Sequence, residues 1–178
     1  MTGVEKAARD FRQEVSRQID IVYGAAEIAL YREYGFKKRL VKVFESANDV
    51  FMKECGLNQG KSVPQLLEEV TDINLKVDEN GRSWHELAVF NYDMLNKRYR
   101  HQTPAMQILM YQQQKKWMGV CLMSALLVSL ARNYGFGQKR LLRIMNDVAE
   151  VEKEFSLDGR KLVEEGKRLT GVQIFKDK

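Results

Sequence analysis

Apolar residues recur every three or four positions from residue 4 to residue 30, the spacing that places them on one face of an α-helix. Thr2-Gly3-Val4-Glu5 has the form of a capping box, which satisfies free amides at a helix start. Gly35 stands where a left-handed residue would end the helix. The pattern predicts one long helix from Thr2 to Tyr34. Its inward positions are Val4, Ala8, Phe11, Val15, Ile19, Val22, Ala26 and Leu30.

Three shorter elements are predicted after this helix. A second helix is expected over residues 37–55, and Pro64 opens a short helix over residues 64–70. Residues 73–77 alternate between apolar and polar side chains, which predicts a short strand. The turn residues at 78–81 then close the first part of the chain.

The remainder of the chain repeats this order after one additional helix. Ser83-Trp84-His85-Glu86 is a second capping box and predicts a helix over residues 83–101. Thr103 and Pro104 then begin a long helix that runs to Tyr134, with proline at the position where its missing amide costs nothing. Further helices are expected over 139–155 and 161–169, followed by a strand over 172–175.

The sequence itself also recurs. Leu30-Tyr31-Arg32-Glu33-Tyr34-Gly35-Phe36 returns as Leu130-Ala131-Arg132-Asn133-Tyr134-Gly135-Phe136, and one extra residue then precedes the second Lys-Arg-Leu. We therefore predict a nearly all-α fold of two pseudo-symmetric repeats, residues 1–80 and 81–178, that share one core. Each repeat reads long helix, Gly-Phe turn, helix, short helix, short strand, and the two strands could pair. The extra residue predicts that the two second helices are not presented identically.

Composition limits the class of protein. The chain has 178 residues, 44% of them hydrophobic, which is enough for one compact unit. Its two cysteines, Cys55 and Cys121, have no partner at metal-ligand spacing and are interpreted as reduced core residues. The longest apolar run, residues 118–131, is shorter than the ~20 residues that span a bilayer, so a buried helix is expected there. The N-terminus lacks the layout of a secretion signal, and we expect a cytoplasmic protein without membrane contact.

Charge concentrates on the repeated motif. The formal net charge is +5, yet residues 32–43 and 132–143 each carry +4, so the rest of the chain sums to −3. This asymmetry indicates an anionic partner for the motif, although a pair of solvated helix starts would give the same pattern.

The spacing around each Gly-Phe turn is that of a helix-turn-helix, in which the second helix enters the major groove. Lysine, arginine and glutamine at the start of that helix are types that hold phosphates or read bases. A plain helical hairpin, with Phe36 and Phe136 filling the core, remains an alternative. The candidate nucleic-acid-binding residues are Lys37, Lys38, Arg39, Lys42, Gln138, Lys139, Arg140 and Arg143.

A second zone combines aromatic and basic residues, a composition that fits single-stranded nucleic acid but is a weaker signal than the basic turns. It consists of Tyr92, Arg98, Tyr99, Arg100, Tyr111, Lys115, Lys116 and Trp117. Signs of an enzyme are weak: His85 and His101 have no catalytic or metal spacing, and no nucleotide-binding or hydrolase motif is present. The paired carboxylates at 68–69 and 164–165 would point apart on a helix. We expect a non-enzymatic protein without cofactor, metal or catalytic residues.

The segment Tyr134-Gly135-Phe136-Gly137-Gln138-Lys139-Arg140-Leu141, together with Leu169-Thr170-Gly171-Val172-Gln173-Ile174, resembles small helical proteins of unassigned function from phages and prophages of Firmicutes. The resemblance covers about residues 119–175, and less closely 19–78, where Asp72 replaces Gly171. It implies a phage accessory protein in the bacterial cytoplasm that binds nucleic acid. Alternatives are an inhibitor of a host nucleic-acid-handling protein, such as a defence nuclease, and a sponge for a nucleotide signal. A homodimer is left open.

Overall fold

The computed structural model describes residues 1–55, 61–75 and 103–174, and within these ranges all regular secondary structure is helical. The all-α prediction is therefore confirmed for this part of the chain. The expected strands are wrong where they can be followed, because residues 73–75 and 172–174 have no regular secondary structure. The amides of Ile73 and Val172 instead donate to the hydroxyls of Thr71 and Thr170, at 3.2 and 3.1 Å. The helix expected at 83–101 lies outside the described residues.

Two long helices, α1 (Gly3–Tyr34) and α5 (Pro104–Tyr134), form the centre of the molecule. Both begin as the sequence predicts: Thr2 and Glu5 complete a capping box, and the Thr103 hydroxyl accepts from the Met106 amide at 3.3 Å. Both also end as predicted, at Gly35 and Gly135, whose φ angles are +64° and +63°. These left-handed conformations are ones that glycine adopts without strain.

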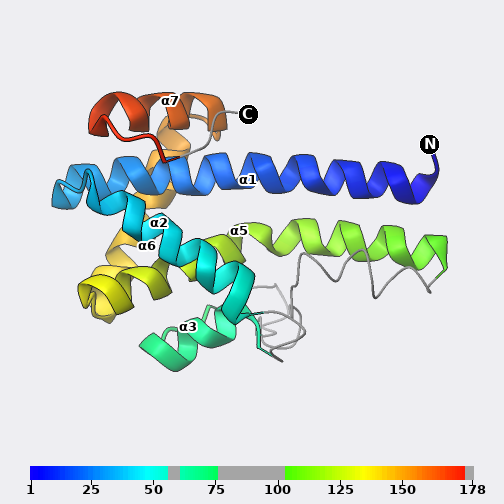
Figure 1. The fold of residues 1–178 in the computed structure, drawn as a ribbon, viewed down its shortest axis with the longest axis horizontal. Coiled ribbons are helices and arrows are strands. Elements are labelled where there is room, and N and C mark those ends of the chain that lie inside the picture. The colour runs from blue at the N-terminus through cyan, green and yellow to red at the C-terminus, as the bar shows by residue number, and fades with distance from the viewer. Residues whose placement is uncertain (56–60, 76–102, 175–178) are drawn as a thin grey trace.

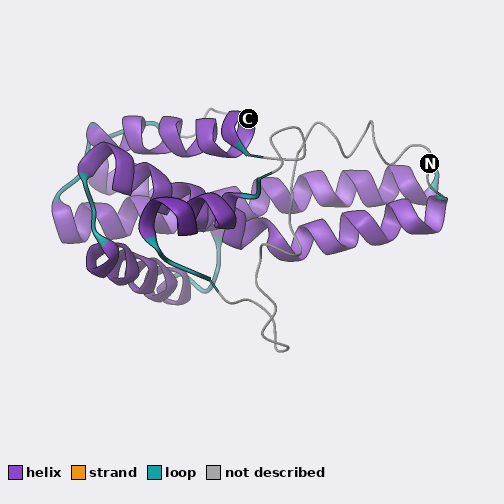
Figure 2. Cartoon of the chain, turned by 90° about the horizontal axis from the view of Figure 1, so that it is seen from below, coloured by secondary structure: helices purple, strands orange, loops and turns teal. Residues whose placement is uncertain are grey.

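The long helices run parallel, side by side along their length (Figures 1 and 2). Near their starts, a Cβ on Gly3 would stand 3.3 Å from Ile108, and the rings of Phe11 and Tyr111 lie 5.6 Å apart. The N-terminal parts of the two helices project as an arm beyond the other described helices. All other described helices pack around the C-terminal parts.

The shorter helices cross from one half of the chain to the other. α2 (Arg39–Asp49), which continues as the π-helix η1 (Val50–Glu54), and α3 (Val63–Thr71) pack on α5. In the same way, α6 (Gln138–Glu154) and α7 (Gly159–Thr170) pack on α1. Each half therefore covers the long helix of the other, and both share one continuous hydrophobic core.

The apolar run of α5 lies in this core, as predicted, with residues 125–128 fully buried. No helix in the described ranges is long and apolar enough to cross a membrane. Cys55 and Cys121 are buried and free, and burial raises the pKa of each thiol to about 12.

α7 lies unusually close to α1. A Cβ on Gly24 would stand 3.0 Å from the Leu162 Cβ, and a Cβ on Gly166 would stand 2.6 Å from Oε2 of Glu27. Glu27 is only 1% exposed, and its Oε1 accepts a hydrogen bond from the Thr170 hydroxyl at 2.8 Å. Burial raises the pKa of Glu27 to about 7, because the charged form loses its hydration, while the Thr170 hydrogen bond opposes the rise.

Candidate nucleic-acid interface

The two Gly-Phe turns meet at one end of the molecule, on the left in Figure 1. In each turn the phenylalanine amide donates back into the long helix, from Phe36 to the Leu30 carbonyl and from Phe136 to the Leu130 carbonyl, both at 3.4 Å. This is the pattern of a Schellman motif, in which a left-handed glycine is followed by a residue that bonds to the last turn. This turn geometry directs both phenylalanine rings into the core.

Four aromatic rings join the two turns. Tyr34 lies 4.9 Å from Phe136, Tyr134 lies 5.0 Å from Phe36, and the two phenylalanines are 6.2 Å apart, measured between ring centroids. The rings are tilted relative to one another, an arrangement that favours aromatic pairs. The Tyr134 hydroxyl also donates to the Arg39 carbonyl at 3.2 Å. The turns thus hold each other in place, and the residues that follow them emerge at the same end.

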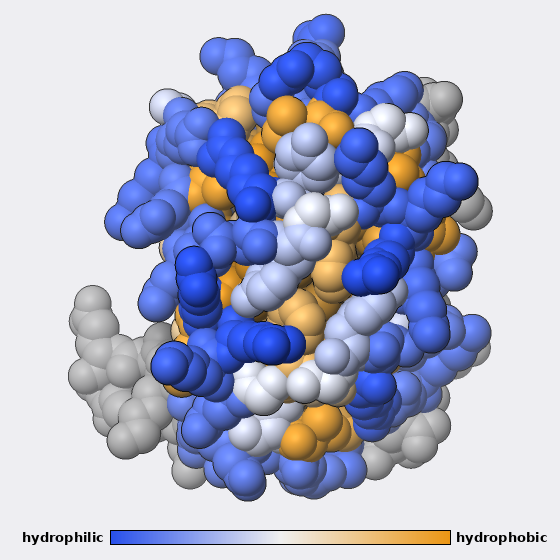
Figure 3. All heavy atoms as spheres, turned by 90° about the vertical axis from the view of Figure 1, so that its left-hand side faces the viewer, coloured by the Kyte–Doolittle hydropathy of each residue, from blue (hydrophilic) through white to orange (hydrophobic). Residues whose placement is uncertain are grey.

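We call the surface formed by these residues the end face. Figure 3 shows it: hydrophilic side chains surround a central strip of paler and apolar residues. All the predicted site residues are exposed there, at the starts of α2 and α6: Lys37, Lys38, Arg39, Lys42, Gln138, Lys139, Arg140 and Arg143.

The extra residue in the second turn does not disturb the contacts that follow it. The Arg39 guanidinium lies over the Phe36 ring at 5.6 Å, and that of Arg140 lies over the Phe136 ring at 5.7 Å. Cation–π contacts of this kind orient an arginine without neutralising it. The arginine–ring contacts of the two turns therefore match. The helix starts themselves differ, as the sequence predicts: Arg39 is the first residue of α2, whereas Arg140 is the third residue of α6.

Some of the basic side chains at this end of the molecule form ion pairs with acidic residues. Arg143 donates to Glu33 at 2.7 Å, which removes it from the set of free cations. Further back, Arg32 pairs with Glu154 and Arg132 with Glu54, each at 2.7 Å. Within the described part of the chain, six cations of the end face have no acidic partner: Lys37, Lys38, Arg39, Lys42, Lys139 and Arg140.

The helix starts add to this positive field. Neither α2 nor α6 has a side-chain cap or an acidic residue in its first turn. The helix dipole at such a terminus favours an anion. At α2 the amides of Leu40 and Val41 already donate to the carbonyls of Lys37 and Lys38, at 3.0 and 3.3 Å, so only α6 also offers free first-turn amides.

The packing differs from that of a helix-turn-helix. α2 packs mainly on α5, and α6 packs mainly on α1, so the second helix of each turn rests on the long helix of the other half. Presentation of both helix starts depends on both halves of the chain.

Two ion pairs behind the end face have no local signal in the sequence. Arg32 and Arg132 differ by 100 positions, and so do their partners Glu154 and Glu54. The same offset relates the two Gly-Phe turns, but the extra residue after the second turn shifts the repeat by one position, so the repeat alone does not match Glu54 with Glu154.

The other candidates do not form a site. Glu68 accepts from Asn74 and Glu69 pairs with Lys61, while Glu164 pairs with Arg160 and Glu165 with Arg168. Tyr111 of the second aromatic and basic zone is buried against Phe11. The zone's other aromatic side chains and both histidines lie outside what the structure describes. Among described residues, no group of three or more metal-ligating side chains is present.

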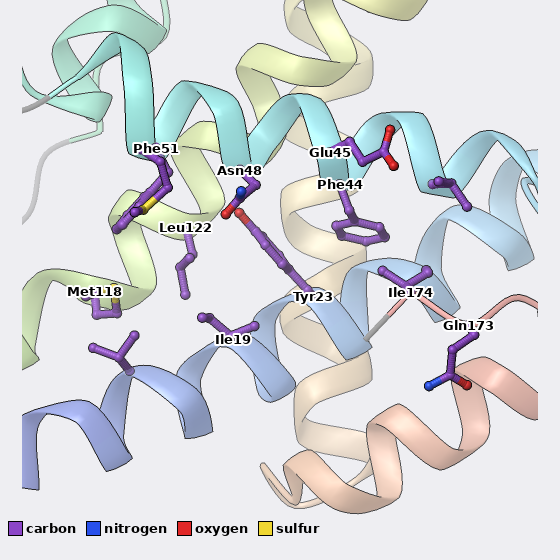
Figure 4. A pocket seen from close by; sticks show the side chains of 13 residues that line it. Ile19, Tyr23, Phe44, Glu45, Asn48, Phe51, Met118, Leu122, Gln173 and Ile174 are labelled. Atoms are coloured by element: carbon purple, nitrogen blue, oxygen red, sulfur yellow. The ribbon is translucent and has the colours of Figure 1, made fainter. Parts of the chain in front are cut away.

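An apolar groove that the sequence did not indicate lies between α1 and α2 (Figure 4). It has a volume of about 820 Å³, and Met118 and Leu122 of α5 and Ile174 close its sides. Tyr23 rises across it from α1 toward α2. The Tyr23 hydroxyl is buried and has no hydrogen-bond partner in the described part of the chain, and burial raises its pKa.

The chain matches no protein-family model, no curated protein and no solved structure.

Proposed function

We propose that this protein is a non-enzymatic phage accessory protein that binds a polyanion, nucleic acid, through the end face. The observation that carries the proposal is the contact between Phe36 and Phe136, which unites two basic turns that lie 100 residues apart in sequence. Six cations that have no acidic partner among the described residues then share one surface. Binding of phosphates by such a set releases condensed counterions, which favours association.

We also propose that the two halves arose by tandem duplication and that each copy covers the long helix of the other. Reciprocal contacts support this: Arg32 with Glu154 against Arg132 with Glu54, and Tyr34 with Phe136 against Tyr134 with Phe36. A duplicated unit presents each surface feature twice, which accounts for the paired basic turns.

The test is fluorescence anisotropy with labelled nucleic acids across a range of salt concentrations. We expect binding at low salt that weakens steeply as salt rises, and its loss in the double variant Lys38→Glu plus Lys139→Glu. The matched control is Lys6→Glu plus Arg12→Glu, which makes the same change in charge on the arm, at the far end of α1. Equal binding by both double variants would place the interaction elsewhere, and no binding by the native chain would remove the proposal.

The alternative, inhibition of a host protein, is favoured by the apolar groove between α1 and α2. Binding of a protein there would use apolar anchors and would tolerate salt. Met52→Glu, at the groove and 45% exposed, would abolish it and would leave nucleic-acid binding intact.

A further inference from the structure

The end face offers phosphate contacts, and its two phenylalanine rings are closed to base stacking. Phe36 and Phe136 are only 5% and 7% exposed, and arginines cover them. The Lys37 ammonium lies over the ring of Tyr31, at 5.8 Å. Proteins that bind single strands combine a basic groove with open aromatic faces, because unpaired bases gain energy by stacking. Tyr34 and Tyr134 are only partly exposed, because they pack on Phe136 and Phe36. Among the described residues of the end face, the basic component therefore outweighs the aromatic one.

The cations also have a two-fold arrangement. Arg39 and Arg140 make equivalent contacts on either side of the Phe36–Phe136 pair. Lys38 and Lys139 immediately precede these arginines, so they flank the same centre. The two antiparallel strands of a duplex are also related by two-fold axes, which lie perpendicular to the helix axis. When a two-fold symmetric protein binds DNA, its axis coincides with one of these axes, and equivalent parts of the protein contact equivalent parts of the duplex.

From these two observations we infer that the end face binds double-stranded nucleic acid through its backbone, with one basic turn on each strand and no readout of bases. The inference rests on the proposed function and narrows it to one class of polyanion. The complex is centred on the phenylalanine pair, so that the approximate two-fold axis of the protein coincides with one of the duplex. Contacts made only to phosphates position a protein and carry no sequence information.

The two turns do not contribute equally. The first supplies four cations and the second only Lys139 and Arg140. The reason is that neutral Gln138 stands where the first turn has Lys37, and that Glu33 holds Arg143. The cations of the first turn are Lys37, Lys38, Arg39 and Lys42. Six phosphate contacts would give a slope of log K against log salt of about −5, which corresponds to a loss of about 10³-fold in affinity between 50 and 200 mM salt.

The experiment compares a mixed-sequence duplex with one of its single strands, at equal length, by anisotropy across salt. The variants are Lys38→Gln, Lys139→Gln and the combination of both. These side chains are exposed and make no ion pair within the described part of the chain, so folding is preserved and can be checked by the helical circular dichroism spectrum. Lys6→Gln is the control.

We expect the duplex to bind at least about 10-fold more tightly than the single strand, independently of its sequence. Each single variant should reduce the magnitude of the salt slope by about 1, and the pair by about 2. Equal or tighter binding of the single strand would overturn the inference and leave polyanion binding standing. An unchanged slope in either single variant would overturn the assignment of one turn to each strand. If no nucleic acid binds, the proposed function itself fails.

Discussion

Around the Gly-Phe turns, and at the ion pairs just behind them, the two halves of the chain make matching contacts, whereas deeper along the same two long helices they do not. The glycine caps, the crossed aromatic pairs and the guanidinium–ring contacts correspond residue by residue. Behind them, Glu27 of α1 faces Gly166 of α7. The corresponding positions on α5 and α3 hold Leu127 and Leu67, both fully buried.

The difference shows that the body of the molecule and the end face meet different structural requirements. The body of the molecule must fill volume, and it does so with a buried carboxyl against a glycine in one interface and with two leucines in the other. The end face must hold two turns in one geometry, and the crossed aromatic pairs that join the turns are matched. Four predictions test this contrast.

The largest effect is expected at the rings that join the turns. Phe36→Ala and Phe136→Ala should each lower the free energy of unfolding by about 3–5 kcal/mol, because both remove a buried ring from the core. Urea denaturation of each variant measures this. The two costs should agree within about 1 kcal/mol, and the double variant should cost less than their sum, since the rings contact each other. A small cost at one ring alone would mean that the turns are not equivalent.

The second prediction concerns the carboxyl that the other half lacks. Burial raises the pKa of Glu27 from its ordinary value of 4.5 to about 7, so the folded state holds a proton in that interval that the unfolded state has lost. Stability should therefore fall as pH rises from 4.5 to 7, by up to about 3 kcal/mol. Thermal unfolding across pH should show this fall in the native chain and a clearly smaller one in Glu27→Gln, since burial also raises the pKa of Glu152 and Asp147. The exposed Glu164→Gln serves as the control, and a similar fall in Glu27→Gln would exclude Glu27 as its source.

The third prediction concerns the glycine opposite that carboxyl. A methyl group at Gly166 would stand 2.6 Å from Oε2 of Glu27, so Gly166→Ala should destabilise by about 1–2 kcal/mol despite the better helix propensity of alanine. Combination with Glu27→Ala should relieve that clash in a double-mutant cycle. Gly119→Ala is the matched control: its nearest neighbour is the Gln18 side chain at 3.5 Å, and no loss is expected. Additive costs at 27 and 166 would mean that the two positions do not interact.

The smallest effect is expected for the reciprocal ion pairs behind the end face. Arg32→Ala and Arg132→Ala remove exposed pairs, each worth about 0.2–1 kcal/mol. Both costs should shrink in 1 M salt because the charges are screened. Measurement of both variants at low and high salt tests this, and a persistent cost would indicate packing by the arginine stems.

Much of the helical fold is predictable from the sequence because its signals are local. The Thr2 capping box, the Thr103-Pro104 start and the glycines at 35 and 135 fix the ends of α1 and α5. The strands were wrong because alternation over a few residues does not create a pairing partner, and a threonine hydroxyl took the amide that a strand would have used.

The basic residues of the candidate site were also predictable, since the charges at the start of a helix follow directly from the sequence. What the sequence does not specify is the packing of each turn against its equivalent, which depends on contacts about 100 residues apart. The pairing of Arg143 with Glu33, which removes one cation from the end face, is long-range in the same way. The apolar groove around Tyr23 arises from surfaces of three helices and has no local signal.

The measurement that tests the central claim most directly is the salt-dependent affinity of the native chain for a duplex, beside Lys38→Glu plus Lys139→Glu. If the two turns act together, the native chain binds with a steep salt slope and the double variant loses binding at every salt concentration. Binding that is insensitive to salt, or that survives both charge reversals, would contradict the account.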